Sequence, residues 1–216
     1  MKQLDKISVG GFCLGPVRTN TYIVYRDKSA VIIDPADNGE GIFDAVSDEG
    51  LTIEAVLITH AHFDHILGLE GLLSKKKVPV YAAAAEKELC SDADKNQSAV
   101  FQRACTVSAD HWIEDGEAFT AGGIGFTMIH TPGHTPGSCC YYIDNGDEPL
   151  LFSGDTLFQA SVGRTDLPGG NAKELRQSVM KLYEMLPDNT HVYPGHGEAT
   201  WLGFEKKYNP YVSMEG

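Results

Sequence analysis

The sequence predicts an α/β fold, and two observations lead to this prediction. Short apolar runs that are typical of buried strands alternate along the chain with segments whose apolar residues recur at helical spacing. Several of these runs end directly before His or Asp residues, and α/β folds form their sites at the carboxyl ends of strands. With 216 residues, no internal repeat and no low-complexity linker, we expect one domain over residues 1–216.

The apolar runs and periodic segments predict the individual elements. The expected strands are, in chain order, Thr21–Tyr25, Ala30–Ile33, Ile53–Ile58, Val78–Tyr81, Ile124–Ile129, Ser138–Ile143, Leu150–Ser153 and His191–Tyr193. The expected helices are Glu40–Ser47, His65–Ser74, Ala84–Cys90, Ala172–Met185 and Thr200–Lys207. Asn171, with Glu174 three residues later, predicts a capped start for the fourth helix. Asp144-Asn145-Gly146-Asp147 predicts a hairpin turn.

The strongest indication of function follows the apolar run Ala55-Val56-Leu57-Ile58. The next residues read Thr59-His60-Ala61-His62-Phe63-Asp64-His65, which places three imidazoles and a carboxylate within six positions. In extended backbone His60 and His62 point to the same side, and Asp64 and His65 follow as the chain turns into a helix. Imidazole and carboxylate are ligands of zinc, copper and iron, so this density predicts a metal site.

Three further residues of the same kind each follow a short apolar run. They are His134 in Thr131-Pro132-Gly133-His134-Thr135-Pro136-Gly137, Asp155 in Ser153-Gly154-Asp155, and His196 in Pro194-Gly195-His196-Gly197. Taken alone, a histidine after a strand is more often a packed residue, and a Gly-Asp pair is usually only a turn. The joint pattern favours ligands brought together at one edge of the fold.

These seven residues resemble the motif set of the metallo-β-lactamase superfamily, and within it the glyoxalase II-like hydrolases. The resemblance extends from Asn20-Thr21-Tyr22 to Pro194-Gly195-His196-Gly197 and implies a four-layer αββα sandwich with two metal ions between the sheets. It implies that one ion is bound by His60, His62 and His134, that the second is bound by Asp64, His65 and His196, and that Asp155 bridges them. Zinc is the expected metal, with iron or manganese as alternatives.

The charges of such a centre suit hydrolysis of a carbonyl compound. Two divalent ions bring four positive charges, and Asp64, Asp155 and a bridging hydroxide remove three, so a positive centre remains for an oxyanion. Metal-bound hydroxide is then the expected nucleophile, with Asp64 and Asp155 as the catalytic carboxylates. A thiolate leaves without a strong general acid because its pKa is near ~8.5. A small thioester, such as a glutathione conjugate, is therefore the expected substrate.

The loop after Asp155 contains the expected substrate-binding residues, Arg164 and Phe158. Glyoxalase II enzymes use a cation at the offset of Arg164 for the glycine carboxylate of glutathione, and a guanidinium can grip a carboxylate with two parallel hydrogen bonds. The alternative is that Arg164 only clamps its own loop by pairing with Asp166.

Other features depart from the long glyoxalase II enzymes. Only about twenty residues follow His196, so the C-terminal helical domain that helps hold glutathione is expected to be missing. Glu198 stands where those enzymes carry a Tyr, and Asp166 stands where an aromatic often follows the cation. The chain most resembles the short, single-domain bacterial glyoxalase II-type hydrolases.

Two other activities stay open. The persulfide dioxygenases share the fold and bind one iron through the positions of His60, His134 and Asp155, but their last motif usually reads Pro-Ala-His-Asp-Tyr, unlike Pro194-Gly195-His196-Gly197. A lactonase, a phosphodiesterase or another small-ester hydrolase could use the same two metals.

Composition limits the partners and the compartment. Lys and Arg total 17 and Asp and Glu total 30, and the resulting net charge of −13 disfavours binding to nucleic acid. The N-terminal residues contain no signal-peptide core, and no apolar stretch is long enough for a membrane span. The five cysteines match no zinc-finger spacing, and Cys139 and Cys140 should point to opposite faces of a strand. We therefore expect a cytoplasmic protein that contacts neither nucleic acid nor membrane.

Residues outside the seven-residue set could support it. His130, four residues before His134, is the best candidate to support a metal ligand through a hydrogen bond. The turn Asp34-Pro35-Ala36-Asp37 could do the same, or could be a plain connection between a strand and a helix. His111 and His191 are expected to be packing or solvated residues.

Overall fold

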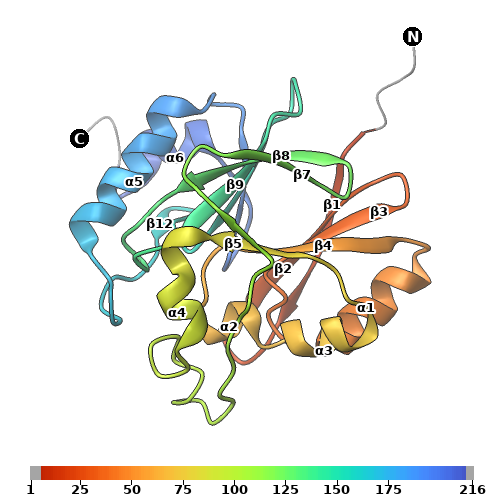
Figure 1. The fold of residues 1–216 in the computed structure, drawn as a ribbon. Helices are drawn as coiled ribbons and strands as arrows, with labels where there is room; N and C mark the ends of the chain where they lie inside the picture. The colour runs from red at the N-terminus through yellow and green to blue at the C-terminus, as the bar shows by residue number, and fades with distance from the viewer. Residues whose placement is uncertain (1–5, 213–216) are drawn as a thin grey trace.

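The computed structural model describes residues 6–212 and shows two six-stranded sheets that pack face to face, with helices on both outer faces (Figure 1). The first sheet contains, in spatial order, β1 (Ser8–Leu14), β2 (Thr19–Arg26), β3 (Ser29–Ile33), β4 (Thr52–Ile58), β5 (Val80–Ala83) and β6 (His111–Ile113). The second contains β14 (Thr200–Trp201), β13 (His191–Pro194), β10 (Leu150–Gly154), β9 (Cys139–Ile143), β8 (Ile124–His130) and β7 (Ala118–Ala121). The predicted αββα sandwich is confirmed.

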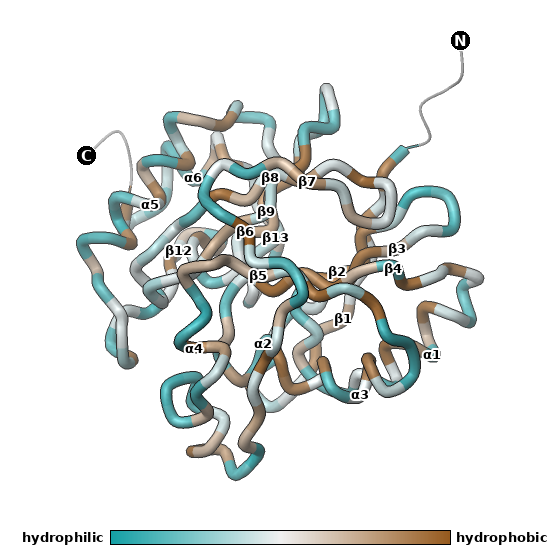
Figure 2. The backbone as a smooth tube through the Cα atoms, viewed as in Figure 1, coloured by the Kyte–Doolittle hydropathy of each residue, from teal (hydrophilic) through white to brown (hydrophobic). Residues whose placement is uncertain are grey.

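Three apolar layers hold this sandwich together. The first lies between the first sheet and the helices α1 (Gly39–Asp48), α2 (Phe63–Ile66), α3 (Leu69–Lys75), η1 (Ala84–Glu86) and α4 (Lys87–Ser91). The second fills the space between the two sheets, and the third lies beneath α5 (Ala172–Met185) and α6 (Leu202–Tyr208). In Figure 2 the strands in the middle of the molecule are largely brown, whereas the helices alternate brown and teal, as expected for helices with one buried face.

Successive residues of a strand enter different layers. Cys139 belongs to the layer between the sheets and Cys140 to the layer under α5, which confirms that the two thiols point to opposite faces. Val31 and Ile32 of β3 are divided in the same way. Both faces of the central strands are therefore buried, and such strands have the near-continuous apolar sequences that made them recognisable.

Three predicted helices differ from the structure, and one of them, Ala84–Cys90, begins as the 3₁₀ turn η1 before α4. The segment expected as one helix over His65–Ser74 is two short helices, because Gly68 lies against the turn after β3 and its N–H donates to Pro35 O at 2.8 Å. Thr200–Trp201 forms β14 beside β13, so the last helix begins only at Leu202. The predicted cap is present, since Asn171 Oδ1 accepts from the N–H groups of Lys173 and Glu174.

The strands that were not predicted lie mostly at sheet edges. They are β1, β6, β7, β14 and the small hairpin of β11 (Leu157–Phe158) and β12 (Ser161–Val162). β1 contains two adjacent glycines and is at best half-buried, so it lacks the apolar run by which buried strands are recognised. Within residues 6–212, no helix is both long and apolar enough to cross a membrane.

Candidate metal centre

Strand direction brings the predicted ligands to one edge of the sandwich. β8, β10 and β13 run parallel to one another in the second sheet, because β9 is antiparallel to both β8 and β10 and because β10 pairs in parallel with β13. Their carboxyl ends therefore lie at one edge, and the loops after them carry His134, Asp155 and His196. The end of β4 joins them from the first sheet, where Thr59 O accepts from Cys139 N at 2.9 Å.

All seven predicted ligands lie together in three overlapping groups that could each hold a metal ion. The groups are His60, His62 and His134; His60, His65 and Asp155; and Asp64, His65 and His196. Within each group the candidate ligand atoms lie within 4.8 Å of one another. The structure thus brings together every residue that the sequence pattern selected for metal binding.

Hydrogen bonds orient three of the imidazoles so that Nε2 faces the centre of the cluster. Nδ1 of His65 lies 2.8 Å from Asp34 Oδ2, and Nδ1 of His134 lies 2.7 Å from Arg164 O. Because both partners are acceptors, each Nδ1 carries a proton, and Nε2 is the nitrogen of each ring that is left to bind a metal ion. Thr59 Oγ1 donates to Asp34 and can accept from His60 Nδ1 at 3.2 Å. Nε2 of His60 is then likewise the nitrogen that is left to bind a metal ion.

The side chains present fit bound metal ions because polar atoms at the cluster are buried without hydrogen bonds. Within residues 6–212, these atoms are Nε2 of His60, His62 and His65 and Oδ1 of Asp155. Such atoms are costly in a folded protein unless a further group contacts them. In addition, His62 Nδ1 lies only 2.8 Å from His134 Nε2, so two imidazole nitrogens converge on one point. A cation at that point would satisfy both.

Charge is distributed unevenly over the cluster. Burial lowers the pKa of His60 well below its ordinary value and that of His62 to about 3, and neighbouring imidazoles add to both effects. Burial would also lower the pKa of His65, but Asp64, Asp34 and Asp155 raise it well above the ordinary value. His60 and His62 are therefore neutral ligands at pH 7, whereas His65 must release a proton when a metal ion binds.

The two carboxylates of the cluster stay ionised. Burial favours their neutral forms, but His65 and further neighbours hold the pKa of Asp155 well below its usual range and bring that of Asp64 to about 2. Thr19 Oγ1 also donates to Asp64 Oδ2 at 2.5 Å. Asp155 lies between both metal groups, with its oxygens 3.4 Å from His65 Nε2 and 3.5 Å from His134 Nε2. This carboxylate is therefore within reach of residues from both groups.

Two glycines of the motifs are required by close approach. A Cβ on Gly195 would lie 2.2 Å from Asp155 Oδ1 and 2.8 Å from the ring of His65, so a side chain here would displace two ligands. Gly154 has a positive φ of 47°, and a Cβ on it would lie 2.4 Å from Thr59 Oγ1. The Gly-Asp and Pro-Gly-His sequences are thus parts of the site as well as turns.

The cluster opens to solvent beside His196. The side chain of His196 is 28% exposed, and those of Asp64 and Asp155 are at most 10% exposed. The ring of Phe158 lies edge-on to His196, with 6.0 Å between the ring centroids. The predicted substrate residue Phe158 therefore lines the open side of the cluster.

Arg164, the predicted substrate cation, forms a two-bond ion pair with Asp166. Nε and Nη2 of Arg164 each lie 2.7 Å from a carboxylate oxygen, and both side chains are more than 60% exposed. The loop clamp therefore exists in the structure. Arg164 also lines an open hollow of about 430 Å³ together with Arg176 and Tyr211, so its guanidinium stays accessible from solvent.

The residue that supports a predicted metal ligand through a hydrogen bond is Asp34 and not His130. His130 Nε2 bonds Pro136 O at 2.9 Å, so this residue braces the loop that carries His134 but contacts no ligand side chain in the structure. Asp34 does contact one, and it also accepts from Thr59 N at 2.8 Å. The turn after β3 is therefore more than a plain connection, because its Asp34 bonds the predicted ligand His65. His111 and His191 lie apart from the cluster: His111 stacks on Tyr81, and the ring of His191 lies tilted against that of Trp201.

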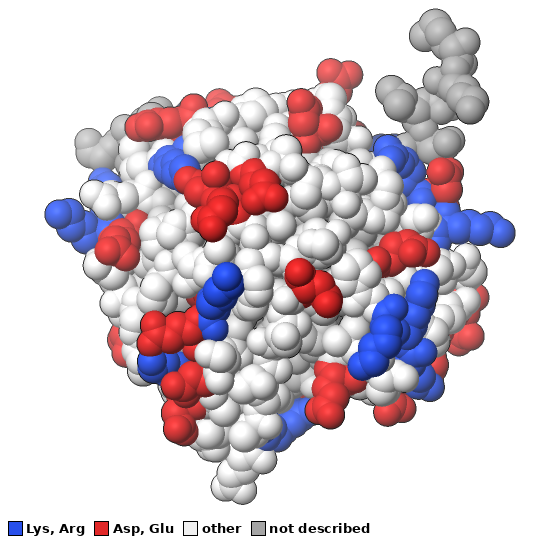
Figure 3. Space-filling model, in the orientation of Figure 1, with Lys and Arg blue, Asp and Glu red and all other residues white. Residues whose placement is uncertain are grey.

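On the face shown in Figure 3, a group of basic side chains lies at the lower right with acidic side chains beside it, and acidic side chains gather at the upper left. All five cysteines, including buried Cys139 and Cys140, are free thiols.

Sequence comparison places these motifs among known proteins. The sequence profile of the Metallo-beta-lactamase superfamily matches residues 14–196. The chain is 39% identical over 202 residues to the probable metallo-hydrolase YqgX of Bacillus subtilis, and the match covers 93% of this chain and 95% of that protein. It is 29% identical over 200 residues to the hydroxyacylglutathione hydrolase GloC of Haemophilus influenzae, covering 91% of this chain and 93% of that protein.

Structural comparison agrees. The crystal structure of the BLEG-1 B3 metallo-beta-lactamase superposes with a TM-score of 0.88 at 40% sequence identity and covers 95% of this chain and 99% of that one. The crystal structure of TTHA1623 in a di-iron-bound form superposes with a TM-score of 0.82 at 35% identity, covering 94% of this chain and 100% of that one.

Proposed function

The chain belongs to the metallo-beta-lactamase superfamily, and from this premise we propose that it hydrolyses a small thioester, with hydroxyacylglutathione hydrolase (glyoxalase II-like) activity as its specific reaction. The observation that carries the proposal is the convergence of seven ligand side chains around buried atoms without hydrogen bonds. His60, His62 and His134 would hold one ion, Asp64, His65 and His196 the other, and Asp155 would lie between them. Zinc is the proposed metal, although the relative in a di-iron-bound form leaves iron as an alternative.

Bound divalent ions would supply a polarised carbonyl and a water of lowered pKa. The protein's own residues do the rest. Asp155 and Asp64 keep negative charge at the centre, and the hydrogen bond from Thr19 prevents Asp64 from turning away. Phe158 and the exposed side of His196 provide the surface against which the substrate lies. Since a thiolate leaving group departs without a strong general acid, this scheme requires no protonated side chain at the centre.

A comparison of three substrate classes tests the reaction. Purified protein is assayed with S-D-lactoylglutathione, with a simple lactone and with a chromogenic cephalosporin, because one relative is named a hydroxyacylglutathione hydrolase and a structural neighbour a B3 metallo-beta-lactamase. We expect kcat/KM to be at least about tenfold higher for the thioester. A higher value for the cephalosporin or the lactone would replace thioester hydrolysis by that activity and would leave the metal centre as described.

Arg164→Ala tests how the substrate is held. If Arg164 binds the substrate carboxylate, this change should raise KM for S-D-lactoylglutathione by roughly tenfold and change kcat by much less, because one charge-assisted contact is lost from the bound ground state. Arg176→Ala is the matched control, since Arg176 lines the same hollow and has no ion-pair partner within residues 6–212. An unchanged KM in Arg164→Ala would leave Arg164 with the loop clamp to Asp166 alone.

A further inference from the structure

Glu86 is a buried carboxylate at the junction between the two sheets. It is the last residue of η1, directly before α4, and is only 1% exposed. Burial raises its pKa to about 7, although hydrogen bonds from Ala61, Thr135 and Gly137 act in the opposite direction. None of the steps assigned above to the metal ligands uses this residue. Burying a carboxylate lowers the stability of the folded protein unless hydrogen bonds compensate for the lost contact with water.

The hydrogen bonds of Glu86 reach both loops that carry the first metal group. Oε1 accepts from Ala61 N at 2.9 Å, between His60 and His62 at the end of β4. Thr135 Oγ1, next to His134 in the loop after β8, lies 3.0 Å from each carboxylate oxygen. The two loops belong to different sheets, so one carboxylate ties the first sheet to the second at this point.

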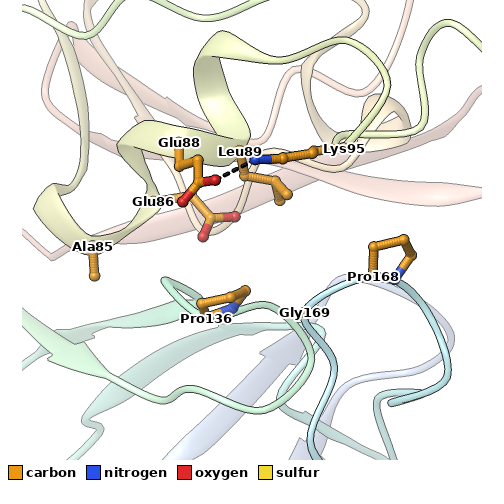
Figure 4. Close-up of a pocket in the computed structure, with 8 residues that line it drawn as sticks. All are labelled: Ala85, Glu86, Glu88, Leu89, Lys95, Pro136, Pro168 and Gly169. Carbon is orange, nitrogen blue, oxygen red and sulfur yellow. Dashed lines mark hydrogen bonds and ion pairs between the residues drawn. The ribbon is translucent and has the colours of Figure 1, made fainter.

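The packing around the carboxylate is close. A Cβ on Gly137 would lie 2.4 Å from Glu86 Oε2, so only glycine allows the loop to approach this near. Figure 4 shows the carboxylate between α4 and the loop of Pro136, at the floor of a cavity of about 290 Å³. Glu88, at the same cavity, points instead toward Lys95 and is paired with it. In the part of the chain that the structure describes, the side chain of Glu86 therefore has no solvent-exposed partner, unlike Glu88, and it bonds only to the two loops that carry predicted ligands.

We propose that Glu86 is a positioning residue that sets the distance between the pair His60 and His62 and the third histidine, His134. Because the three imidazoles come from two sheets, their separation depends on how the sheets are joined at this edge. Glu86 fixes that separation through its hydrogen bonds to Ala61 and Thr135, which are the sequence neighbours of the histidines. This inference rests on the proposed two-metal centre and concerns the His60, His62 and His134 group alone. Among the described residues, Glu86 makes no hydrogen bond to Asp64, His65 or His196.

Glu86→Gln isolates this role. The amide keeps the shape of the side chain but has one acceptor oxygen, so its NH₂ must face a donor, either Ala61 N or the side of Thr135 and Gly137. Loss of such a supporting bond typically lowers metal affinity by about 10- to 100-fold. Glu88→Gln is the matched control, because it removes a carboxylate from the same cavity without touching a ligand loop.

The test is a Co²⁺ titration of metal-free protein against a chromophoric chelator. His196→Ala breaks the Asp64, His65 and His196 group and leaves His60, His62 and His134 in place, so this background removes the second proposed ion site and keeps the first. We expect Glu86→Gln to weaken Co²⁺ binding by about 10- to 100-fold in the His196→Ala background, and Glu88→Gln to leave it unchanged. In the otherwise wild-type chain, the same change should weaken one of two sites and spare the other.

Three outcomes would decide against parts of the account. Wild-type affinity of Glu86→Gln in the His196→Ala background overturns the positioning role. Equal weakening of both sites in the otherwise wild-type chain also overturns it, because the effect would then be general. Failure of the wild-type protein to bind two ions instead contradicts the proposed centre itself. If Glu86→Gln does not fold, Thr135→Val takes its place, because it removes one hydrogen-bond donor to Glu86. We then expect Co²⁺ binding by the His60, His62 and His134 group to weaken several-fold. Unchanged Co²⁺ affinity would overturn the positioning role of Glu86.

Discussion

Asp155→Asn is expected to lower kcat/KM for the thioester by about 10³-fold or more and to reduce the bound metal below two ions per chain. Asp155 is the carboxylate that lies between both metal groups, with its oxygens 3.4 Å from His65 Nε2 and 3.5 Å from His196 Nε2. The amide keeps the size of the side chain but removes the negative charge that two cations would share. Metal analysis and steady-state kinetics on the same sample measure both effects.

Asp188→Asn serves as its control, because Asp188 is an exposed carboxylate that pairs with Lys206 on the surface. This variant should keep wild-type metal content and rate. Should Asp155→Asn retain both, the bridging role would be wrong, whatever the substrate.

Asp34→Ala is expected to have the second largest effect, on both metal affinity and folding. Asp34 accepts from His65 Nδ1 at 2.8 Å and from Thr59 Oγ1 at 2.6 Å, and all three residues are buried. Its removal frees the ring of His65 to turn and leaves buried donors without a partner. We expect about 10- to 100-fold weaker metal binding and a loss of roughly 3 kcal/mol in the free energy of unfolding. Urea denaturation of the metal-free and metal-loaded protein separates the two effects.

Asp34→Asn and Asp37→Asn complete this experiment. Asp34 has a positive φ of 52°, which Asn tolerates better than Ala, so Asp34→Asn reports the lost carboxylate without the backbone strain. Asp37 lies in the same turn and pairs with Arg103, without contact to His65. Equal effects of Asp37→Asn and Asp34→Asn would mean that the turn matters only for folding.

The ligands could be predicted from the sequence because their positions obey a local rule. Each of them follows a recognisable apolar run, and parallel strands bring their carboxyl ends to one edge. Buried central strands such as β4 have continuous apolar sequences, whereas the edge strand β1 is interrupted by two glycines and the edge strand β6 has only three residues. The break between α2 and α3 depends on contact of Gly68 with the turn after β3, which no local pattern reports.

The supporting residues were harder to predict because their role depends on contacts between distant segments. Asp34 could be weighed only as one of two alternatives, since it lies 31 residues from His65 in the chain. No local pattern marks Glu86, which is one of 30 acidic residues and lies in a segment expected to be a helix. His130 lies four residues before His134 in sequence, but the chain turns so that its ring bonds Pro136 O instead of a ligand.

The two-metal thioester hydrolase is tested most directly by measuring metal content and anaerobic turnover on the same sample. Protein purified with its native metal is analysed for metal content and then mixed with S-D-lactoylglutathione under anaerobic conditions. The account predicts about two metal ions per chain and rapid loss of the thioester. A single iron per chain with no anaerobic turnover would contradict it, and oxygen uptake with a glutathione persulfide would then identify the mononuclear dioxygenase that the sequence left open.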